Sequence, residues 1–169
     1  CCYTETSRGL KLPLKRIKKK AEELNSKLML DATASIGLEA DHDLADVIGY
    51  SSCKGLFGLT GAAFIAYNSP PEVEVNSFYL NFETHLNKGM TGPYHSICSL
   101  YNVLPKLDDF KLSVIENKKK FMNIYSRYIN LPIENQPLLC TYVNCNIMAK
   151  NKKAVLYQPR GLNEGSVVC

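Results

Sequence analysis

The sequence predicts an α/β fold with a mostly parallel sheet, and three observations support this class. Residues 1–6 and 27–31 are strand-like, and residues 13–25 between them place apolar side chains at helical spacing, after a proline that suits a first helical turn. A strand–helix–strand order is typical of parallel sheets. The apolar run 60–67 lacks polar alternation, which predicts a strand that is covered on both faces.

Periodicity and turn residues divide the rest of the chain into further elements. We expect a helical turn at 41–45, strands at 47–51 and 60–67, helices at 75–86, 97–104 and 107–129, and strand-like runs at 138–148 and 154–157 around a turn at 150–153. Pro105 is expected to close the helix before it. The change from a parallel-type to an antiparallel-type pattern at this point predicts two domains, 1–104 and 105–169.

Composition limits the classes of partner. The net charge of +4 comes mainly from lysine runs at 15–20 and 118–120; both fall in helix-like patterns without interleaved aromatic residues, which favours solvated helix faces over a nucleic-acid site. The chain shows no signal peptide and no apolar run long enough to span a bilayer, so no membrane partner is expected. The seven cysteines form no C-x-x-C pair and are odd in number, which disfavours a disulfide framework or a zinc site and favours a reducing, cytoplasmic compartment. Because the chain opens on Cys1 and closes on an apolar run, we expect it to be a piece of a longer protein.

Asp31 and Lys54 stand at the ends of two successive predicted strands. Ligand chemistry in α/β sheets gathers at the carboxyl ends of strands. A lysine in an apolar, partly buried pocket has a lowered pKa, and its neutral amine can form a Schiff base with an aldehyde. Pyridoxal phosphate needs such a lysine, together with a carboxylate that keeps its pyridine nitrogen protonated. The pair therefore suits this cofactor.

Simpler interpretations compete with a cofactor site. An aspartate at a strand end often caps a turn, and a Lys-Gly pair is often a surface turn. Cys53 could be a thiol nucleophile, but no histidine lies close to it in sequence, and a free cysteine more often serves as a small apolar residue. The three histidines have no ligand-like spacing, so no metal site is expected.

Four segments together resemble one protein family. Residues 31–37 (DATASIG) and 50–61 (YSSCKGLFGLTG) resemble the cofactor segment of class V pyridoxal-phosphate-dependent aminotransferases. Residues 5–9 (ETSRG) resemble the Glu-Thr-[Ser/Thr]-x-Gly element before it, and residues 89–97 (GMTGPYHSI) resemble the Thr-x-Pro-x-His element after it. Within the family the chain is most similar to 2-aminoethylphosphonate–pyruvate transaminases, and the resemblance is clearest over 3–104.

The resemblance implies a part of a fold-type I pyridoxal-phosphate-dependent transferase. Residues 1–104 would be the C-terminal part of the large cofactor-binding domain and 105–169 a partial small C-terminal domain. The implied reaction transfers an amino group from a small amine, such as 2-aminoethylphosphonate, to a keto acid such as pyruvate. A homodimer with shared sites is implied as well.

The resemblance also assigns roles to single residues. It implies that Lys54 binds pyridoxal 5'-phosphate covalently and later moves a proton, and that Asp31 pairs with the ring nitrogen. Thr6 or Ser7 would lie near the ring hydroxyl, and Ser51 near the phosphate. Thr91 would reach the phosphate bound to the neighbouring subunit.

The chain departs from the family pattern at several points. Arg8 stands where many relatives carry a hydroxyl or a small residue, and Gly92 stands where a proline is common. The phosphate-binding loop, the ring-stacking residue and the substrate-binding arginine are expected outside the chain, since Arg160 comes too early to match that arginine. We therefore expect the chain alone to bind the cofactor poorly or not at all.

Two other hypotheses stay open. The chain could belong to a cysteine-desulfurase-like enzyme or a lyase with the same cofactor, although such relatives usually carry a histidine before the lysine, where Cys53 stands here. Alternatively, it could be a truncated, non-catalytic interaction module.

Overall fold

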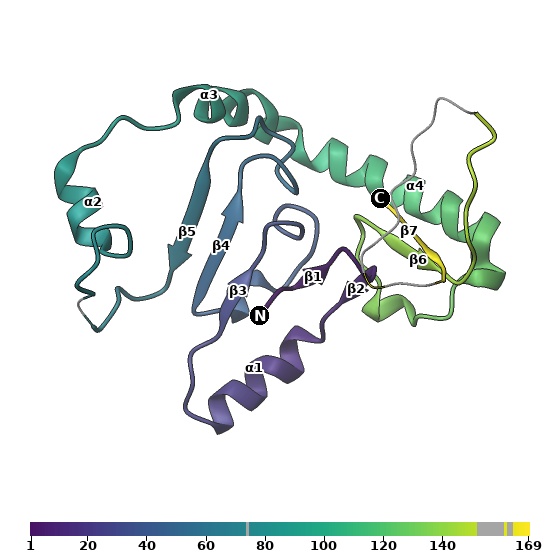
Figure 1. Ribbon diagram of the computed structural model, residues 1–169, viewed down its shortest axis with the longest axis horizontal. Coiled ribbons are helices and arrows are strands. Elements are labelled where there is room, and N and C mark those ends of the chain that lie inside the picture. The colour runs from purple at the N-terminus through teal and green to yellow at the C-terminus, as the bar shows by residue number, and fades with distance from the viewer. Residues whose placement is uncertain (74, 152–160, 162–163) are drawn as a thin grey trace.

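A computed structural model describes residues 1–73, 75–151, 161 and 164–169 of the chain. The largest sheet has the strand order β3 (Met29–Asp31), β4 (Val47–Ser51), β5 (Ala63–Tyr67) (Figure 1). Strands β3 and β4 run parallel, with Leu30 opposite Ile48, whereas β5 runs antiparallel to β4. The predicted α/β class is confirmed.

The predicted strand–helix–strand unit is present at the start of the chain. Cys2 forms a parallel bridge with Asp31, and the backbone N–H of Tyr3 donates to the carbonyl oxygen of Asp31 at 3.0 Å. Helix α1 (Leu14–Glu23) follows Pro13 and returns the chain to β3. Asn25, in the left-handed region at φ 50°, turns the backbone away from the helix.

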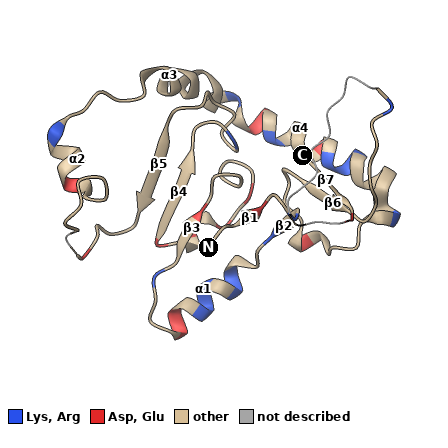
Figure 2. Ribbon diagram, in the orientation of Figure 1, with Lys and Arg blue, Asp and Glu red and all other residues tan. Residues whose placement is uncertain are grey.

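Helix α1 covers one face of the sheet. The core between them consists of buried apolar side chains with partly buried ones packed around them: Tyr3, Leu14, Leu28, Leu30, Ala32 and Ala45, with Ile17, Ile36, Leu44, Ile48 and Tyr50. Helix α1 carries several basic residues (Figure 2), most of which are exposed, and Lys18 forms an ion pair with Asp46 at 3.1 Å. The packing of α1 therefore holds this face of the sheet in place.

The opposite face of the sheet is open to solvent. Met29 in β3 is 66% exposed, and Ile65 and Tyr67 in β5 are 54% and 42% exposed. The expectation that the run 60–67 is covered on both faces is wrong for this chain, because α1 covers one face and the described residues leave the other uncovered.

Three helices follow the sheet: α2 (Phe82–Lys88), α3 (Tyr94–Val103) and α4 (Leu107–Tyr125). Helix α3 ends at Val103, just before Pro105, as predicted, but the chain continues directly into further helical turns. Pro105 lies in a 3₁₀ turn, Leu104–Lys106, that joins α3 to α4, where a proline is tolerated because the first residues of a new helical turn need no backbone donor. Further 3₁₀ turns lie at His42–Leu44, Ser126–Tyr128 and Ile133–Asn135.

The helix expected at 75–86 is shorter and begins later. The side chain of Asn81 accepts a hydrogen bond from the backbone N–H of Thr84 at 2.8 Å and so caps the start of α2. Gly89, at φ 54°, ends the helix in the left-handed conformation. A local capping residue thus overrode the apolar periodicity before it.

Two short antiparallel ladders complete the fold: β1 (Thr4–Glu5) with β2 (Leu10–Lys11), and β6 (Thr141–Val143) with β7 (Ser166–Val168). A Cβ on Gly9 would lie 2.6 Å from the backbone nitrogen of Tyr142, so the turn between β1 and β2 contacts β6 directly. The strand-like run 154–157 lies outside the described residues, as do the last two residues of the turn at 150–153. No helix in the described part of the chain is long and apolar enough to cross a membrane.

Candidate active site

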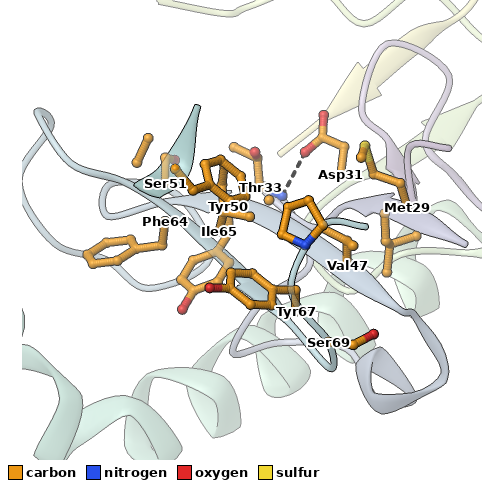
Figure 3. A pocket seen from close by; sticks show the side chains of 15 residues that line it. Met29, Asp31, Thr33, Val47, Tyr50, Ser51, Phe64, Ile65, Tyr67 and Ser69 are labelled. Atoms are coloured by element: carbon orange, nitrogen blue, oxygen red, sulfur yellow. Dashed lines mark hydrogen bonds between the residues drawn. The ribbon is translucent and has the colours of Figure 1, made fainter. Parts of the chain in front are cut away.

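Asp31 ends β3 with its carboxylate fixed by the next turn. Its Oδ1 accepts a hydrogen bond from the backbone N–H of Thr33 at 2.9 Å (Figure 3). This bond, a second from the Thr33 hydroxyl and the positive charge of Lys54 lower the pKa of the exposed Asp31 carboxyl below its ordinary value. Asp31 is therefore an ionised, accessible carboxylate at neutral pH.

Lys54 lies in a tight loop after β4. The buried hydroxyl of Ser52 donates to the carbonyl of Leu59 at 2.6 Å, and the backbone N–H of Gly58 donates to the carbonyl of Ser52 at 2.8 Å. Leu56 is buried, whereas Lys54 is exposed. The expectation of a partly buried, apolar pocket around Lys54 is wrong for the described structure, because the loop turns Leu56, rather than the lysine, toward the interior.

Thr33 joins the Asp31 turn to the Lys54 loop. While its N–H bonds the Asp31 carboxylate, its carbonyl accepts a hydrogen bond from the N–H of Gly55 at 3.4 Å. The two loops touch so closely that a Cβ on Gly55 would lie 2.0 Å from the carbonyl oxygen of Ile36. The only residue type that fits at position 55 without moving one loop is glycine. This contact keeps the carboxylate and the amine on one edge of the sheet.

An apolar hollow of about 620 Å³ lies beside this edge, on the open face of the sheet (Figure 3). Its walls include Val47, Ile65 and Tyr67, and it also takes in Asp31 and Ser51, which end their strands. A few polar groups in the wall of a mostly apolar cavity are typical of a ligand site. Lys54 does not line the hollow; it lies on the neighbouring loop.

Comparison with known proteins rests on structure, since no family model and no curated protein matches the sequence. The chain superposes on an alanine–glyoxylate aminotransferase from Nostoc sp. with a TM-score of 0.69 at 20% identity, over 86% of this chain and 45% of that one. It superposes on a subgroup IV aspartate aminotransferase from Thermus thermophilus with a TM-score of 0.70 at 16% identity, over 98% and 56% of the two chains. A pyridoxamine–pyruvate aminotransferase from Mesorhizobium loti gives 0.62 at 16% identity, over 86% and 44%.

The chain has an aminotransferase fold. It spans about half the length of the aminotransferases that it matches. The predicted fold is thereby confirmed as part of a fold-type I aminotransferase architecture, in which the β3–β4 edge carries the candidate site.

Of the remaining candidate residues, some lie at this edge of the aminotransferase fold and others do not. Ser51 lines the hollow with Asp31, so these two are brought together. Thr6 is in the turn between β1 and β2, where the neighbouring Ser7 hydroxyl donates to the Glu5 carboxylate at 2.6 Å. Thr91 is exposed in the connection between α2 and α3. Neither threonine is among the residues that line the hollow, and Arg160 lies outside the described residues.

Sequence reasoning missed Thr33, which lies between two candidates and contacts both loops. The sequence contained a signal for this contact, because an Asp side chain often accepts a hydrogen bond from the backbone N–H two residues later and so forms an Asx turn. Cys53, next to Lys54, was weighed as a nucleophile and as a small apolar residue. Its thiol has a lowered pKa, chiefly because the Thr60 hydroxyl hydrogen-bonds to it, with help from Ser51.

Proposed function

We propose that this chain is part of a pyridoxal-phosphate-dependent aminotransferase in which Lys54 binds the cofactor and Asp31 pairs with its ring nitrogen. The observation that carries the proposal is the link through Thr33, which holds an ionised Asp31 carboxylate beside the Lys54 loop. The aminotransferase fold of the chain supports it independently.

Each residue has a distinct task in this proposal. Pyridoxal phosphate, when bound, supplies an electron-accepting ring that stabilises negative charge at the substrate Cα. Asp31 stays ionised and holds a proton on the ring nitrogen, since its hydrogen bonds from Thr33 favour the charged form. Lys54, on an exposed loop with a flexible stem, would hold the cofactor and would move a proton at the substrate Cα.

Other residues would hold the phosphate and the ring hydroxyl. Ser51, at the end of β4 and on the rim of the hollow, is proposed to bind the phosphate, and Thr6 or Ser7 to lie near the ring hydroxyl. These assignments rest on the sequence resemblance, with the position of Ser51 as structural support.

We propose a homodimer in which Thr91 binds the phosphate held by the other subunit. Thr91 is exposed between α2 and α3, and large apolar side chains are exposed around it: Met90 at 57%, Tyr94 at 72% and Ile97 at 47%. Exposed apolar groups that cluster in this way mark interaction surfaces. The same resemblance supports the division into a large-domain part, 1–104, and a small-domain part, 105–169.

The proposed substrates are 2-aminoethylphosphonate as amino donor and pyruvate as acceptor. They rest on the similarity of segments 31–37 and 50–61 to transaminases of that specificity. A reducing, cytoplasmic location is proposed from the cysteines, all seven of which are free thiols.

A spectroscopic titration tests the proposal. The chain is titrated with pyridoxal phosphate in excess, and the visible absorbance of the lysine-bound cofactor is recorded. Lys54→Ala should remove the saturable part of this absorbance. Lys119→Ala, which changes another exposed lysine in the middle of α4, should leave it unchanged. A saturable absorbance that is as strong in Lys54→Ala as in the wild type would overturn the assignment of Lys54.

A further inference from the structure

Strands β6 and β7 bring two cysteines to the same end of their ladder. Thr141 pairs with Val168 as the last registered pair, and Cys140 and Cys169 directly flank it. Opposed residues in an antiparallel ladder have Cα atoms about 4.5–5.5 Å apart. Disulfides span Cα distances of about 4.4–6.8 Å, so an extension of this register by one pair suits a disulfide.

The two thiols interact directly although both are free. A hydrogen bond from Cys140 lowers the pKa of the Cys169 thiol, which favours its thiolate form. The same bond, together with burial, raises the pKa of Cys140. Cys169 is exposed, whereas Cys140 is only 1% exposed. Cys169 is thus the more exposed and more acidic cysteine of the pair, and Cys140 is buried.

Helix α4 and Cys169 share the wall of a small hollow. This hollow of about 280 Å³ is lined by Val114 and Phe121 of α4 together with Cys169. Lys118, on the same helix, donates to the backbone carbonyls of Cys140 at 2.9 Å and Pro137 at 3.0 Å. The lysine therefore fixes the backbone at residue 140, and the hollow gives a small reagent room beside Cys169.

We propose that Cys140 and Cys169 form a thiol–disulfide exchange site whose reagent is a low-molecular-weight disulfide such as oxidised glutathione. The Cys169 thiolate attacks one sulfur of the reagent, the reagent's S–S bond breaks, and one thiolate leaves. The Cys140 thiol then loses its proton and attacks the Cys169 sulfur, which expels the second thiolate. Starting from the Cys169 thiolate and the Cys140 thiol, the protein loses two electrons and one proton; the reagent leaves as two thiolates, of which one takes up the Cys140 proton and the other a proton from water.

This site is separate from Asp31 and Lys54 and does not depend on the proposed aminotransferase activity. The bridge would close the segment between β6 and β7 and tie both strands together beneath α4. In a reducing compartment the pair stays open, and a shift toward oxidised thiols closes it.

The test follows the oxidation of each cysteine. The 169-residue chain is equilibrated with mixtures of reduced and oxidised glutathione and quenched with acid. Its remaining thiols are then alkylated, and its peptides are identified by mass spectrometry. We expect a peptide that links Cys140 to Cys169, with the other five cysteines alkylated or carrying glutathione. A linked peptide that joins Cys169 to Cys145, or no linked peptide at any ratio, would overturn the proposal.

Variants separate the two roles. In Cys169→Ser, which changes an exposed residue, Cys140 should stay unmodified by glutathione because it is buried. In Cys140→Ala, chosen because a small apolar side chain suits the buried position, Cys169 should accumulate as a stable mixed disulfide. Cys145→Ser, the matched control on the same segment, should form the Cys140–Cys169 bridge as the wild type does. Rapid glutathionylation of Cys140 in Cys169→Ser would contradict the assigned order of attack.

Discussion

Replacing Gly55 by alanine tests the contact between the two loops of the candidate site. The new Cβ would lie 2.0 Å from the carbonyl oxygen of Ile36 and 3.1 Å from its carbonyl carbon. Ordinary van der Waals contact begins at 3.4 Å, so the loops must separate by about 1.4 Å. The obstacle is backbone, which cannot rotate away as a flexible side chain can.

The cost follows from this displacement. Overpacking of a close contact typically costs about 1–3 kcal/mol. The hydrogen bond from Gly55 to Thr33, already 3.4 Å long, would break and add about 1 kcal/mol. We therefore expect Gly55→Ala to lower the free energy of unfolding by about 2–4 kcal/mol. It should also weaken pyridoxal phosphate capture, since Asp31 and Lys54 move apart.

Urea unfolding followed by circular dichroism measures the first effect, and cofactor absorbance measures the second. Gly92→Ala is the matched control, because a Cβ at this position meets no atom within 4 Å. The control should unfold within about 0.5 kcal/mol of the wild type. If Gly55→Ala were as stable as the Gly92 variant, the close contact between the loops would be wrong.

Further predictions concern single titrating or charged groups. Asp31→Asn should weaken cofactor capture roughly tenfold, about 1.4 kcal/mol, with little change in the urea midpoint, because the exposed Asp31 side chain contributes little to packing. Burial lowers the pKa of His42 below 6.5, against the opposing effect of nearby carboxylates. The stability that neutral His42 contributes is therefore present above pH 6.5 and is lost as the pH falls through the pKa of the folded state. In His42→Gln, the free energy of unfolding should depend less on pH in this range. Burial lowers the pKa of Lys118 to about 8, so its contribution is present above pH 10.5 and is lost as the pH falls through about 8; thermal unfolding of Lys118→Met should lack this part of the pH dependence.

Helix α1 and strands β3 and β4 were predictable from sequence because their local signals agree with the fold. The proline before α1, the apolar spacing along it and the Asp that ends β3 each act within a few residues. The helix expected at 75–86 failed for the opposite reason. Its apolar periodicity is real, but the Asn81 cap fixes the start of α2 later in the chain.

The candidate site was predictable in its residue types but not in its burial. A strand-end carboxylate and a following lysine are visible in the sequence, and the structure places them on one edge of the sheet. Whether Lys54 is buried depends on which side chain of its loop turns inward, and that is decided by packing against residues distant in sequence, such as Leu100 against Gly58. The pairing of Cys140 with Cys169 likewise depends on the register of a ladder that was not predicted, since β7 carried no recognised strand signal.

The central claim is that Lys54, placed beside Asp31, is the residue that binds pyridoxal phosphate. Borohydride reduction of the chain in the presence of the cofactor, followed by peptide mass mapping, tests it most directly because reduction also traps weak binding. The account predicts that the pyridoxyl group is found mainly on Lys54, and that Asp31→Asn lowers this labelling while that of other lysines stays constant. Even labelling across the exposed lysines, with Lys54 no more modified than Lys119, would contradict it.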